Sequence, residues 1–179
     1  MPAPTSADLR RYAPADNLLA DRVILVTGAS GSIGGALARA CARLGARVIL
    51  SGRSVKKLEK LYDSIIADGS PRPSIAPIDF EQADAVAYDA LADAIGSEFG
   101  RLDVMICNAG FGYYGTVEET PGETMRRMMD VNFMGTFYGA RAALPVFRAA
   151  GRGHLVIVSS IVGQRGIAQM SAYSATKAA

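Results

Sequence analysis

Two side chains near the carboxyl end of the sequence have the types and spacing of a proton-transfer pair. Tyr173 and Lys177 are four residues apart, so on a helix they share one face, about 6 Å apart along the axis. An ammonium at that distance lowers the pKa of a phenol below its reference of about 10, and a tyrosine in such a pair can act as a general acid or base. Ser160, thirteen residues earlier, could donate a hydrogen bond to the same reacting oxygen.

A serine hydrolase is the rival class of enzyme, because α/β proteins also carry nucleophilic serines. Such an enzyme needs a histidine base, and this sequence has one histidine, His154. His154 begins the apolar run that precedes Ser160, so we expect it at the opposite edge of the sheet. The sequence therefore disfavours a hydrolase. With one histidine and two distant cysteines it also offers few metal ligands, which disfavours a metal site.

A glycine-rich segment near the amino end has the context of a phosphate-binding turn. Residues 27–34, Thr-Gly-Ala-Ser-Gly-Ser-Ile-Gly, follow an apolar run and open a helical pattern. Such a turn presents backbone N–H groups at the positive end of a helix, and small residues let a pyrophosphate approach the main chain. The alternative is a plain turn between strand and helix. The expected cofactor contacts are Gly28, Ser30, Gly31, Ser32, Ile33 and Gly34.

The residues after the second apolar run bear on which dinucleotide would bind. A site for NAD places an acid there to hold the ribose hydroxyls, whereas this sequence has Ser51, Gly52 and Arg53. An arginine suits a 2′-phosphate, so we expect NADP(H) to be preferred over NAD(H). Lys57, one helical turn further, could add to the same positive pocket. The alternative is that Arg53 and Lys57 are ordinary solvated charges.

Further motifs stand in a fixed order along the chain. They are an Asp after the third apolar run (Asp79), Asn-Ala-Gly after the fourth (residues 108–110), a helical Asn132, then Ser160 and the Tyr-x-x-x-Lys segment (residues 173–177). Together with the glycine turn, this ordered set resembles the short-chain dehydrogenase/reductase family in its most common subtype, from Val23 to the last residue. The resemblance implies an NAD(P)(H)-dependent oxidoreductase with an α/β fold, a Rossmann-like doubly wound parallel sheet.

The residues then take the following expected roles. In the direction of reduction, the nicotinamide gives hydride to a carbonyl carbon, Tyr173 gives its proton to the oxygen and Ser160 holds that oxygen in place. Lys177 is expected to bind the nicotinamide ribose. The resemblance further implies that Asn132 holds a water that links Lys177 to solvent. It also assigns Asp79 and Phe80 to the adenine ring, and Asn108, Ala109 and Gly110 to the central part of the cofactor.

Aromatic residues follow directly, at the edge where open α/β sheets bind ligands. Phe111 and Tyr113, with Tyr114, are therefore candidate substrate contacts, although simple packing is an equal alternative. The expected partner is a small carbonyl or alcohol substrate, and the full-length form is expected to be a homodimer or homotetramer. The alternative function is a dinucleotide-binding or sensing fragment with little or no turnover, against which the intact Ser160, Tyr173 and Lys177 argue.

One position departs from the family pattern. Ser32 stands where the glycine turn normally has its second glycine, and Gly31 precedes it. A Cβ at that point could crowd the pyrophosphate, or the Ser32 hydroxyl could donate to it. The sequence leaves both outcomes open.

The elements that must position these residues can be read from hydrophobic periodicity. Apolar runs at residues 23–26, 47–50, 74–78, 102–107 and 154–158 alternate with helical patterns, which predicts five strands of a largely parallel sheet. One helix is expected to bury a stripe that includes Ile33 and Leu37. Another is expected to open with a capping box at Thr120 and Glu123 and to run through Phe137.

Composition excludes several other classes of protein. Hydrophobic residues make up 50% and charged residues 20%, and the net charge is +2 with the basic residues dispersed, so disorder and nucleic-acid binding are disfavoured. No apolar run approaches the roughly 18 residues of a membrane helix, and the first twenty residues lack the apolar core of a secretory signal. Cys41 and Cys107 suit reduced core thiols. We therefore expect a cytoplasmic protein.

The chain length of 179 residues first suggests one complete domain. We expect residues 1–20 to form an N-terminal arm and residues 21–179 the dinucleotide-binding domain. Six strands of such a fold need about 180 residues, yet the chain ends two residues after Lys177. We therefore expect the front part of a longer reductase, without the last strands and the substrate loop, in which the helix of Tyr173 has little packing.

Overall fold

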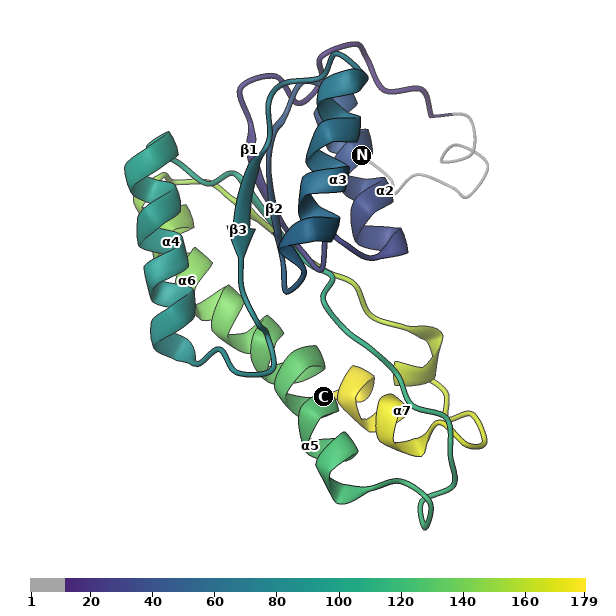
Figure 1. Ribbon diagram of the computed structural model, residues 1–179. Helices are drawn as coiled ribbons and strands as arrows, with labels where there is room; N and C mark the ends of the chain where they lie inside the picture. Colours follow the sequence, from purple (N-terminus) through teal and green to yellow (C-terminus); the bar gives the residue numbers. More distant parts are fainter. Residues whose placement is uncertain (1–11) are drawn as a thin grey trace.

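A computed structural model describes residues 12–179, and a sheet of five parallel strands lies at its centre (Figure 1). From one edge to the other the strands are β3 (Ser74–Pro77), β2 (Arg47–Gly52), β1 (Val23–Thr27), β4 (Val104–Cys107) and β5 (His154–Ile157). Every neighbouring pair is parallel. The expected strands and the Rossmann-like α/β class are confirmed.

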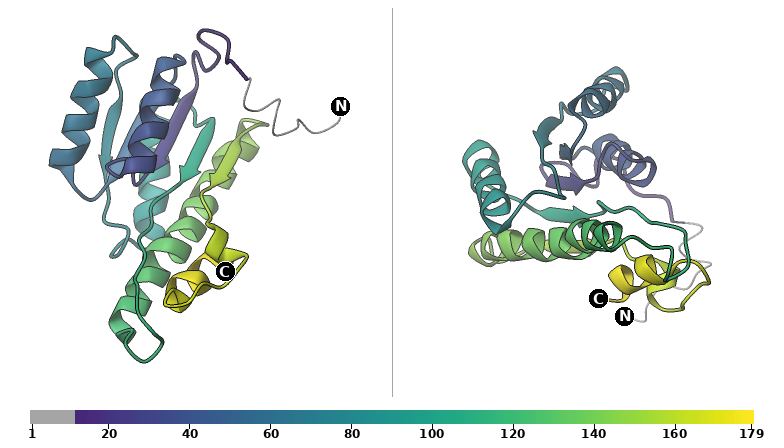
Figure 2. Two further views of the ribbon diagram at one scale, coloured as in Figure 1. Left: turned by 90° about the vertical axis from the view of Figure 1, so that its right-hand side faces the viewer. Right: turned by 60° about the horizontal axis from the view of Figure 1, so that its bottom comes forward.

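Helices cover both faces of the sheet (Figure 1, Figure 2). They are α2 (Ser32–Arg43), α3 (Val55–Ala67), α4 (Ala85–Phe99), α5 (Gly122–Met129), the π-helix η1 (Asp130–Met134), α6 (Gly135–Ala149), the 3-10 turn η2 (Ile161–Gly163) and α7 (Ser171–Ala178). α2 and α3 pack on one face, and α4 and α6 pack on the other. α5, η1 and α6 form one continuous rod.

The central strand β1 shows why its sequence is apolar without interruption. Ile24 and Val26 pack in the cluster formed with α2 and α3, whereas Val23 and Leu25 pack in the cluster formed with α4 and α6. Because side chains alternate between the two faces of a strand, a strand covered on both sides needs apolar residues at every position. All five residues of β1 are buried.

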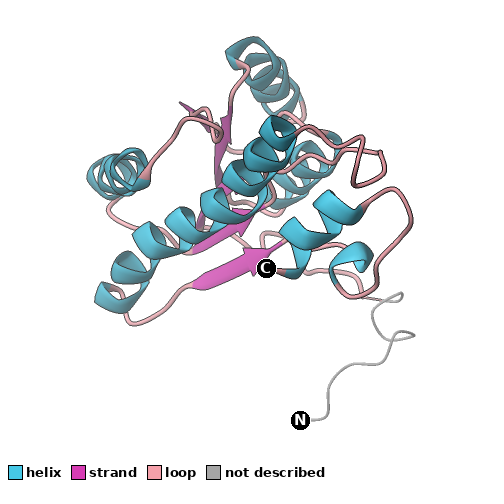
Figure 3. Cartoon of the chain, turned by 90° about the horizontal axis from the view of Figure 1, so that it is seen from below, coloured by secondary structure: helices cyan, strands magenta, loops and turns pink. Residues whose placement is uncertain are grey.

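The strand order creates a crevice at the carboxyl ends of β1 and β4. The chain runs from β1 outward to β2 and β3, and then crosses to β4 and β5 on the other side of β1. Ligands of open α/β sheets bind where the winding reverses in this way. Seen from this end of the sheet, α7 lies beside the first part of the long rod (Figure 3).

The helix after β1 buries the stripe that its periodicity suggested only in part, since Leu37 packs against the core but Ile33 does not. Ile33 is 61% exposed, while Gly34 and Ala38 are buried. A Cβ added to Gly34 would stand 2.3 Å from the Gly28 carbonyl oxygen, so the first turn of α2 lies too close to the glycine turn for a larger side chain. The expectation that Ile33 belongs to the core is wrong, because close backbone approach selects the smallest residues for the buried face.

The long rod forms where it was expected, but its start differs. The helix begins at Gly122 with Pro121 before it, and no side chain of the described residues caps it. The Thr120 hydroxyl donates instead to the Thr116 carbonyl at 2.7 Å. The capping box is therefore wrong, since Thr120 bonds within the preceding loop.

Some expectations fall partly outside the described residues. Residues 1–11 of the proposed N-terminal arm are among them, so the arm and domain boundaries stay predictions. Within residues 12–179, Leu19 packs against the core and its N–H donates to the Leu44 carbonyl at 2.9 Å. The same described part contains no helix with the length and apolar character needed to cross a membrane, and no cluster of three metal-ligating side chains.

Candidate cofactor and catalytic site

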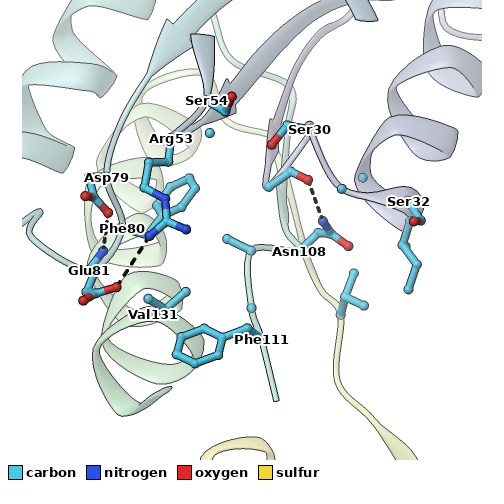
Figure 4. Close-up of a pocket in the computed structure, with 18 of the residues that line it drawn as sticks. Ser30, Ser32, Arg53, Ser54, Asp79, Phe80, Glu81, Asn108, Phe111 and Val131 are labelled. Atoms are coloured by element: carbon cyan, nitrogen blue, oxygen red, sulfur yellow. Dashed lines mark hydrogen bonds and ion pairs between the residues drawn. The ribbon is translucent and has the colours of Figure 1, made fainter. Parts of the chain in front are cut away.

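A cleft of about 670 Å³ opens at the carboxyl ends of the strands. Its walls come from the segments after all five strands, from α5 and η1, and from α7. Figure 4 shows part of this lining, from Ser30 and Ser32 on one side to Asp79 and Glu81 on the other. Every residue expected to contact a cofactor lines it, namely Gly28, Ser30, Gly31, Ser32, Ile33, Gly34, Arg53, Lys57, Asp79, Phe80, Asn108, Ala109 and Gly110. The fold thus gathers segments that are far apart in the sequence into one site.

The glycine turn forms the floor of this cleft. Gly28 has a φ of +66°, and a Cβ there would stand 2.8 Å from the Ala109 Cα, so a side chain is excluded on both grounds. Gly31 precedes α2, and among the described residues no side chain caps that helix, which leaves its first amides open to a ligand. Ser32 is exposed in the cleft without a positive φ, so its Cβ causes no backbone strain.

Thr27 and Asn108 lock the loops after β1 and β4 together. The Asn108 side-chain amide donates to the Thr27 carbonyl at 3.0 Å. The Thr27 hydroxyl accepts from the backbone N–H groups of Asn108 at 2.9 Å and Ala109 at 3.1 Å. Asn108 therefore positions the glycine turn in addition to lining the cleft. Thr27 belongs to the glycine-rich segment, but the sequence predicts no such role for its hydroxyl, which has no spacing signal of its own.

Three charged residues meet at one side of the cleft. Glu81 and Arg127 form a two-point ion pair, with Nε to Oε1 at 2.6 Å and Nη2 to Oε2 at 3.1 Å. Arg53 Nη1 lies 3.6 Å from Oε2 of the same carboxylate. The hydrogen bonds from Arg127 hold the pKa of Glu81 below its ordinary value. Arg127 also lies over the ring of Phe111, 5.8 Å from its centroid.

Asn132 lies buried in the π-helical segment of the rod, and its side chain acts as a tie. Its Oδ1 accepts from the Phe111 N–H at 3.0 Å, and its Nδ2 donates to the Phe111 carbonyl and to the Thr176 hydroxyl, both at 2.9 Å. These bonds join the loop after β4 to α7. The structural role is thus visible, and the water-holding role implied by the resemblance stays a prediction.

Tyr173 and Lys177 both line the cleft from α7. The Tyr173 ring packs against Gly112, where an added Cβ would lie 3.4 Å from its Cγ. The Lys177 ammonium donates to the Val158 carbonyl at 2.9 Å, and burial lowers its pKa. Gly110 lies next to this ammonium, since a Cβ there would be in van der Waals contact with Nζ at 3.5 Å. The two expected catalytic side chains therefore face the same cleft as the glycine turn.

The helix α7 has a packed face, so the expectation of little packing is wrong. Thr176 is buried, and its hydroxyl donates to the Tyr173 carbonyl at 2.9 Å. A Cβ on Gly163 would stand 2.3 Å from the Lys177 carbonyl oxygen, which shows how closely η2 lies against α7. Contacts with α5 and η1 complete its surroundings.

Ser160 stands directly before η2 and follows Ser159 in the chain. Its hydroxyl accepts from the Val162 N–H at 3.4 Å. The neighbouring Ser159 lines the cleft, whereas Ser160 does not. His154 is exposed at the first position of β5, at the other end of that strand, as expected. The catalytic assignment of Ser160 stays a prediction.

The aromatic residues after β4 separate into two groups. Phe111 lines the cleft. Tyr113 does not, and its hydroxyl donates to the Glu119 carbonyl at 3.4 Å within its own loop. Tyr114 is exposed. The substrate contacts proposed for Phe111 and Tyr113 stay predictions, and only Phe111 already faces the ligand space.

Several lining residues were not identified from the sequence. Some of them are direct neighbours of predicted positions. Ser54 follows Arg53 and Glu81 follows Phe80, so extending each predicted segment by one residue would have found them. Arg127 carried no signal, because only the folded chain brings its helix to the cleft. The full set is Gly52, Ser54, Glu81, Arg127, Val131, Val158 and Ser159.

Comparisons with known proteins agree with this geometry. The family model for the short chain dehydrogenases matches residues 22–179. Dehydrogenase/reductase SDR family member 7B of Mus musculus is 37% identical over 161 residues, which are 89% of this chain and 50% of the mouse protein. The chain thus spans about half the length of that relative, and the expectation that it is the front part of a longer reductase stays a prediction.

Solved structures with bound cofactor are also similar. A metagenomic short-chain oxidoreductase in complex with NADP superposes with a TM-score of 0.83 at 35% identity, over 89% of this chain and 71% of that one. A protein of Escherichia coli assigned to the short-chain dehydrogenases and complexed with NADPH gives a TM-score of 0.87 at 37% identity, over 92% and 69% of the two chains.

Proposed function

The chain belongs to the short-chain dehydrogenase/reductase family, and from this premise we propose that it binds NADP(H) and reduces a ketone or aldehyde to an alcohol. The observation that carries the proposal is the placement of Tyr173 and Lys177 in the same cleft as the glycine turn and Arg53. One face of this cleft suits a dinucleotide, and another presents a phenol and an ammonium to its interior.

The shape of the cleft fits a dinucleotide. A volume of about 670 Å³ lies within the range of cofactor sites. The glycine turn lets phosphate oxygens reach the first amides of α2, where the helix dipole favours negative charge. Gly28 and Gly34 leave no room for side chains, so the backbone itself forms the floor.

The charges at one end favour a 2′-phosphate. The Arg53 side chain is 68% exposed, so its guanidinium can reach a ligand, and Lys57 lines the same end. Ser54 precedes α3, and its hydroxyl makes no capping bond to that helix within the described chain. Structural relatives that hold NADP or NADPH support this choice. Preference over NAD(H) is part of the proposal.

The side chains around the reacting end can then divide the chemistry. When bound, the nicotinamide supplies a hydride to the carbonyl carbon, and the C=O bonding pair moves to the oxygen. The Tyr173 hydroxyl gives its proton to that oxygen. Because Ser160 accepts a bond from the Val162 N–H, its own proton is free to donate to the same oxygen. Lys177 is held by the Val158 carbonyl, which places its positive charge at the cleft wall.

The assembly is an expectation from the family, and the location is an expectation from the composition. A homodimer or homotetramer and a cytoplasmic location are consistent with the fold, and both stay predictions.

The proposal is tested by NADPH consumption with a panel of ketones and aldehydes. We expect NADPH to bind and to be oxidised with at least one carbonyl compound, one alcohol formed per NADPH. A protein that binds NADPH but turns over no member of a broad panel would instead favour the dinucleotide-binding alternative. A protein that binds neither NADPH nor NADH would contradict the proposal outright.

A further inference from the structure

We propose that Arg127 is a specificity-determining residue, which secures the preference for NADP(H) by neutralising Glu81 beside Arg53. This inference rests on the proposed function, because it concerns the same cleft. It assigns a role to a residue of α5 that lies outside the glycine turn and outside the strand end where cofactor preference is usually sought.

The carboxylate of Glu81 stands in an unfavourable place for a phosphate ligand. It lines the cleft, and its Oε2 lies 3.6 Å from Arg53 Nη1 (Figure 4). The Glu81 backbone N–H donates to Asp79 Oδ1 at 3.2 Å, which holds the segment after β3 in this position. A carboxylate so close to the guanidinium competes with a 2′-phosphate for Arg53, and its negative charge repels the phosphate. Left alone, Glu81 would therefore favour a cofactor without that phosphate.

Arg127 removes this obstacle by occupying both oxygens of the carboxylate. Its bonds of 2.6 and 3.1 Å are shorter than the Arg53 contact of 3.6 Å, so Glu81 is paired mainly with Arg127. Glu81 is only 17% exposed, whereas Arg53 is 68% exposed. The least exposed member of the triad, Glu81, is thus paired by Arg127, and the more exposed guanidinium of Arg53 is left for the ligand.

The charges support the same conclusion. Two arginines and one carboxylate sum to +1, and loss of Arg127 leaves Arg53 and Glu81 to cancel. Lys57 and Asp79 also line this end of the cleft, and their opposite charges cancel, so the net charge still falls by one when Arg127 is lost. Without Arg127, a phosphate would therefore meet the neutral pair of Arg53 and Glu81 instead of a group of three with a net positive charge.

Arg127 is also fixed from a second side. Its guanidinium lies over the Phe111 ring, and Phe111 is held by Asn132 through its backbone. An arginine anchored at both ends keeps the Glu81 carboxylate paired whether or not a ligand is present. This makes the triad a preformed part of the site.

The test compares NADPH with NADH, which share every feature except the 2′-phosphate. We expect Arg127→Gln to raise the Kd of NADPH about tenfold and to change the Kd of NADH by less than about twofold. Arg127→Lys, which keeps the charge, should recover part of the loss. Arg126→Gln is the matched control, because it removes the same charge from the same helix at an exposed residue that does not line the cleft. It should leave both constants unchanged.

The double variant shows whether Arg127 acts through Glu81. In a Glu81→Gln background, the factor by which Arg127→Gln raises the Kd of NADPH should be at least threefold smaller than in the parent. If Arg127→Gln raises the Kd of NADPH equally in both backgrounds, Arg127 contacts the phosphate directly. If it raises the Kd of NADPH and of NADH equally, its role is merely structural. Either result overturns the inference. If the parent binds NADPH in preference to NADH, these outcomes leave the proposed function standing. A parent that binds neither cofactor contradicts that function itself.

Discussion

Asn132 Nδ2 donates to the Thr176 hydroxyl at 2.9 Å, and this bond joins the middle of the long rod to the helix that carries Tyr173 and Lys177. The two residues lie 44 positions apart. Through its other bonds Asn132 also holds the backbone of Phe111. One buried amide thus fixes the relative positions of the loop after β4 and α7.

Replacement of the Thr176 hydroxyl should loosen this joint. Thr176→Val keeps the shape but leaves one Asn132 N–H without its partner, so we expect a loss of about 1 kcal/mol in the free energy of unfolding. Turnover should fall, while NADPH binding changes little. Urea denaturation and NADPH titration measure these effects, and Thr176→Ser is the control that keeps the hydroxyl. Unchanged stability and turnover in Thr176→Val would show that the bond has no positioning role.

Reversal of the charge at Arg53 should change cofactor preference. Arg53→Glu places a second carboxylate beside Glu81, so we expect NADPH to be weakened at least tenfold more than NADH. Fluorescence titration of both cofactors measures the ratio. Equal effects on the two would contradict the assignment of Arg53 to the 2′-phosphate.

Ser32 offers a test of the unusual glycine turn. Its side chain is exposed in the cleft at the first position of α2, so we expect its hydroxyl to donate to the pyrophosphate. Ser32→Ala should therefore raise the Kd of NADPH and of NADH about threefold each, which is the effect of one modest hydrogen bond. A lower Kd in Ser32→Gly than in the parent would show instead that the Cβ crowds the ligand.

Asp103 should make the fold sensitive to acid. Burial raises its pKa, but hydrogen bonds from Arg101, the Val23 N–H and Arg22 outweigh that effect and hold the pKa below its ordinary value of 3.8. A carboxyl whose pKa is depressed in the folded state stabilises the fold at pH values above its pKa in the unfolded state. That contribution is lost as the pH falls through the pKa of the folded state.

Asp103→Asn should therefore lower the free energy of unfolding by about 2 kcal/mol at pH 7. It should also reduce the slope of stability against pH below about pH 4. Urea denaturation at a series of pH values from about 3 to about 7 measures both. A parent and variant with parallel pH profiles would contradict this role of Asp103.

Much of the site could be predicted because its parts are local. The apolar runs are continuous where a strand is covered on both faces, as in β1, and the turn after it has small residues that only a close ligand or backbone requires. Tyr173 and Lys177 are four residues apart on one helix, so their shared face follows from helix geometry. Such features need no knowledge of the tertiary structure.

Other features could not be predicted because distant side chains create them. Arg127 and Glu81 lie 46 positions apart, and no local pattern marks either as a partner of the other. Periodicity placed Ile33 in the core, but the glycine turn comes so close to α2 that glycine and alanine take the buried face. Thr120 has the spacing of a capping residue, yet its hydroxyl bonds to Thr116. Tertiary contacts decided each case.

The most direct test of the proposed reduction compares the parent with Tyr173→Phe. The change removes one hydroxyl and keeps the ring that packs against Gly112, so we expect NADPH to bind within about twofold of the parent. Loss of a general acid typically costs about 10² to 10⁴ in rate, and carbonyl-dependent NADPH oxidation should fall by that much. A Tyr173→Phe protein that oxidises NADPH at the rate of an active parent would contradict the assignment of the proton donor.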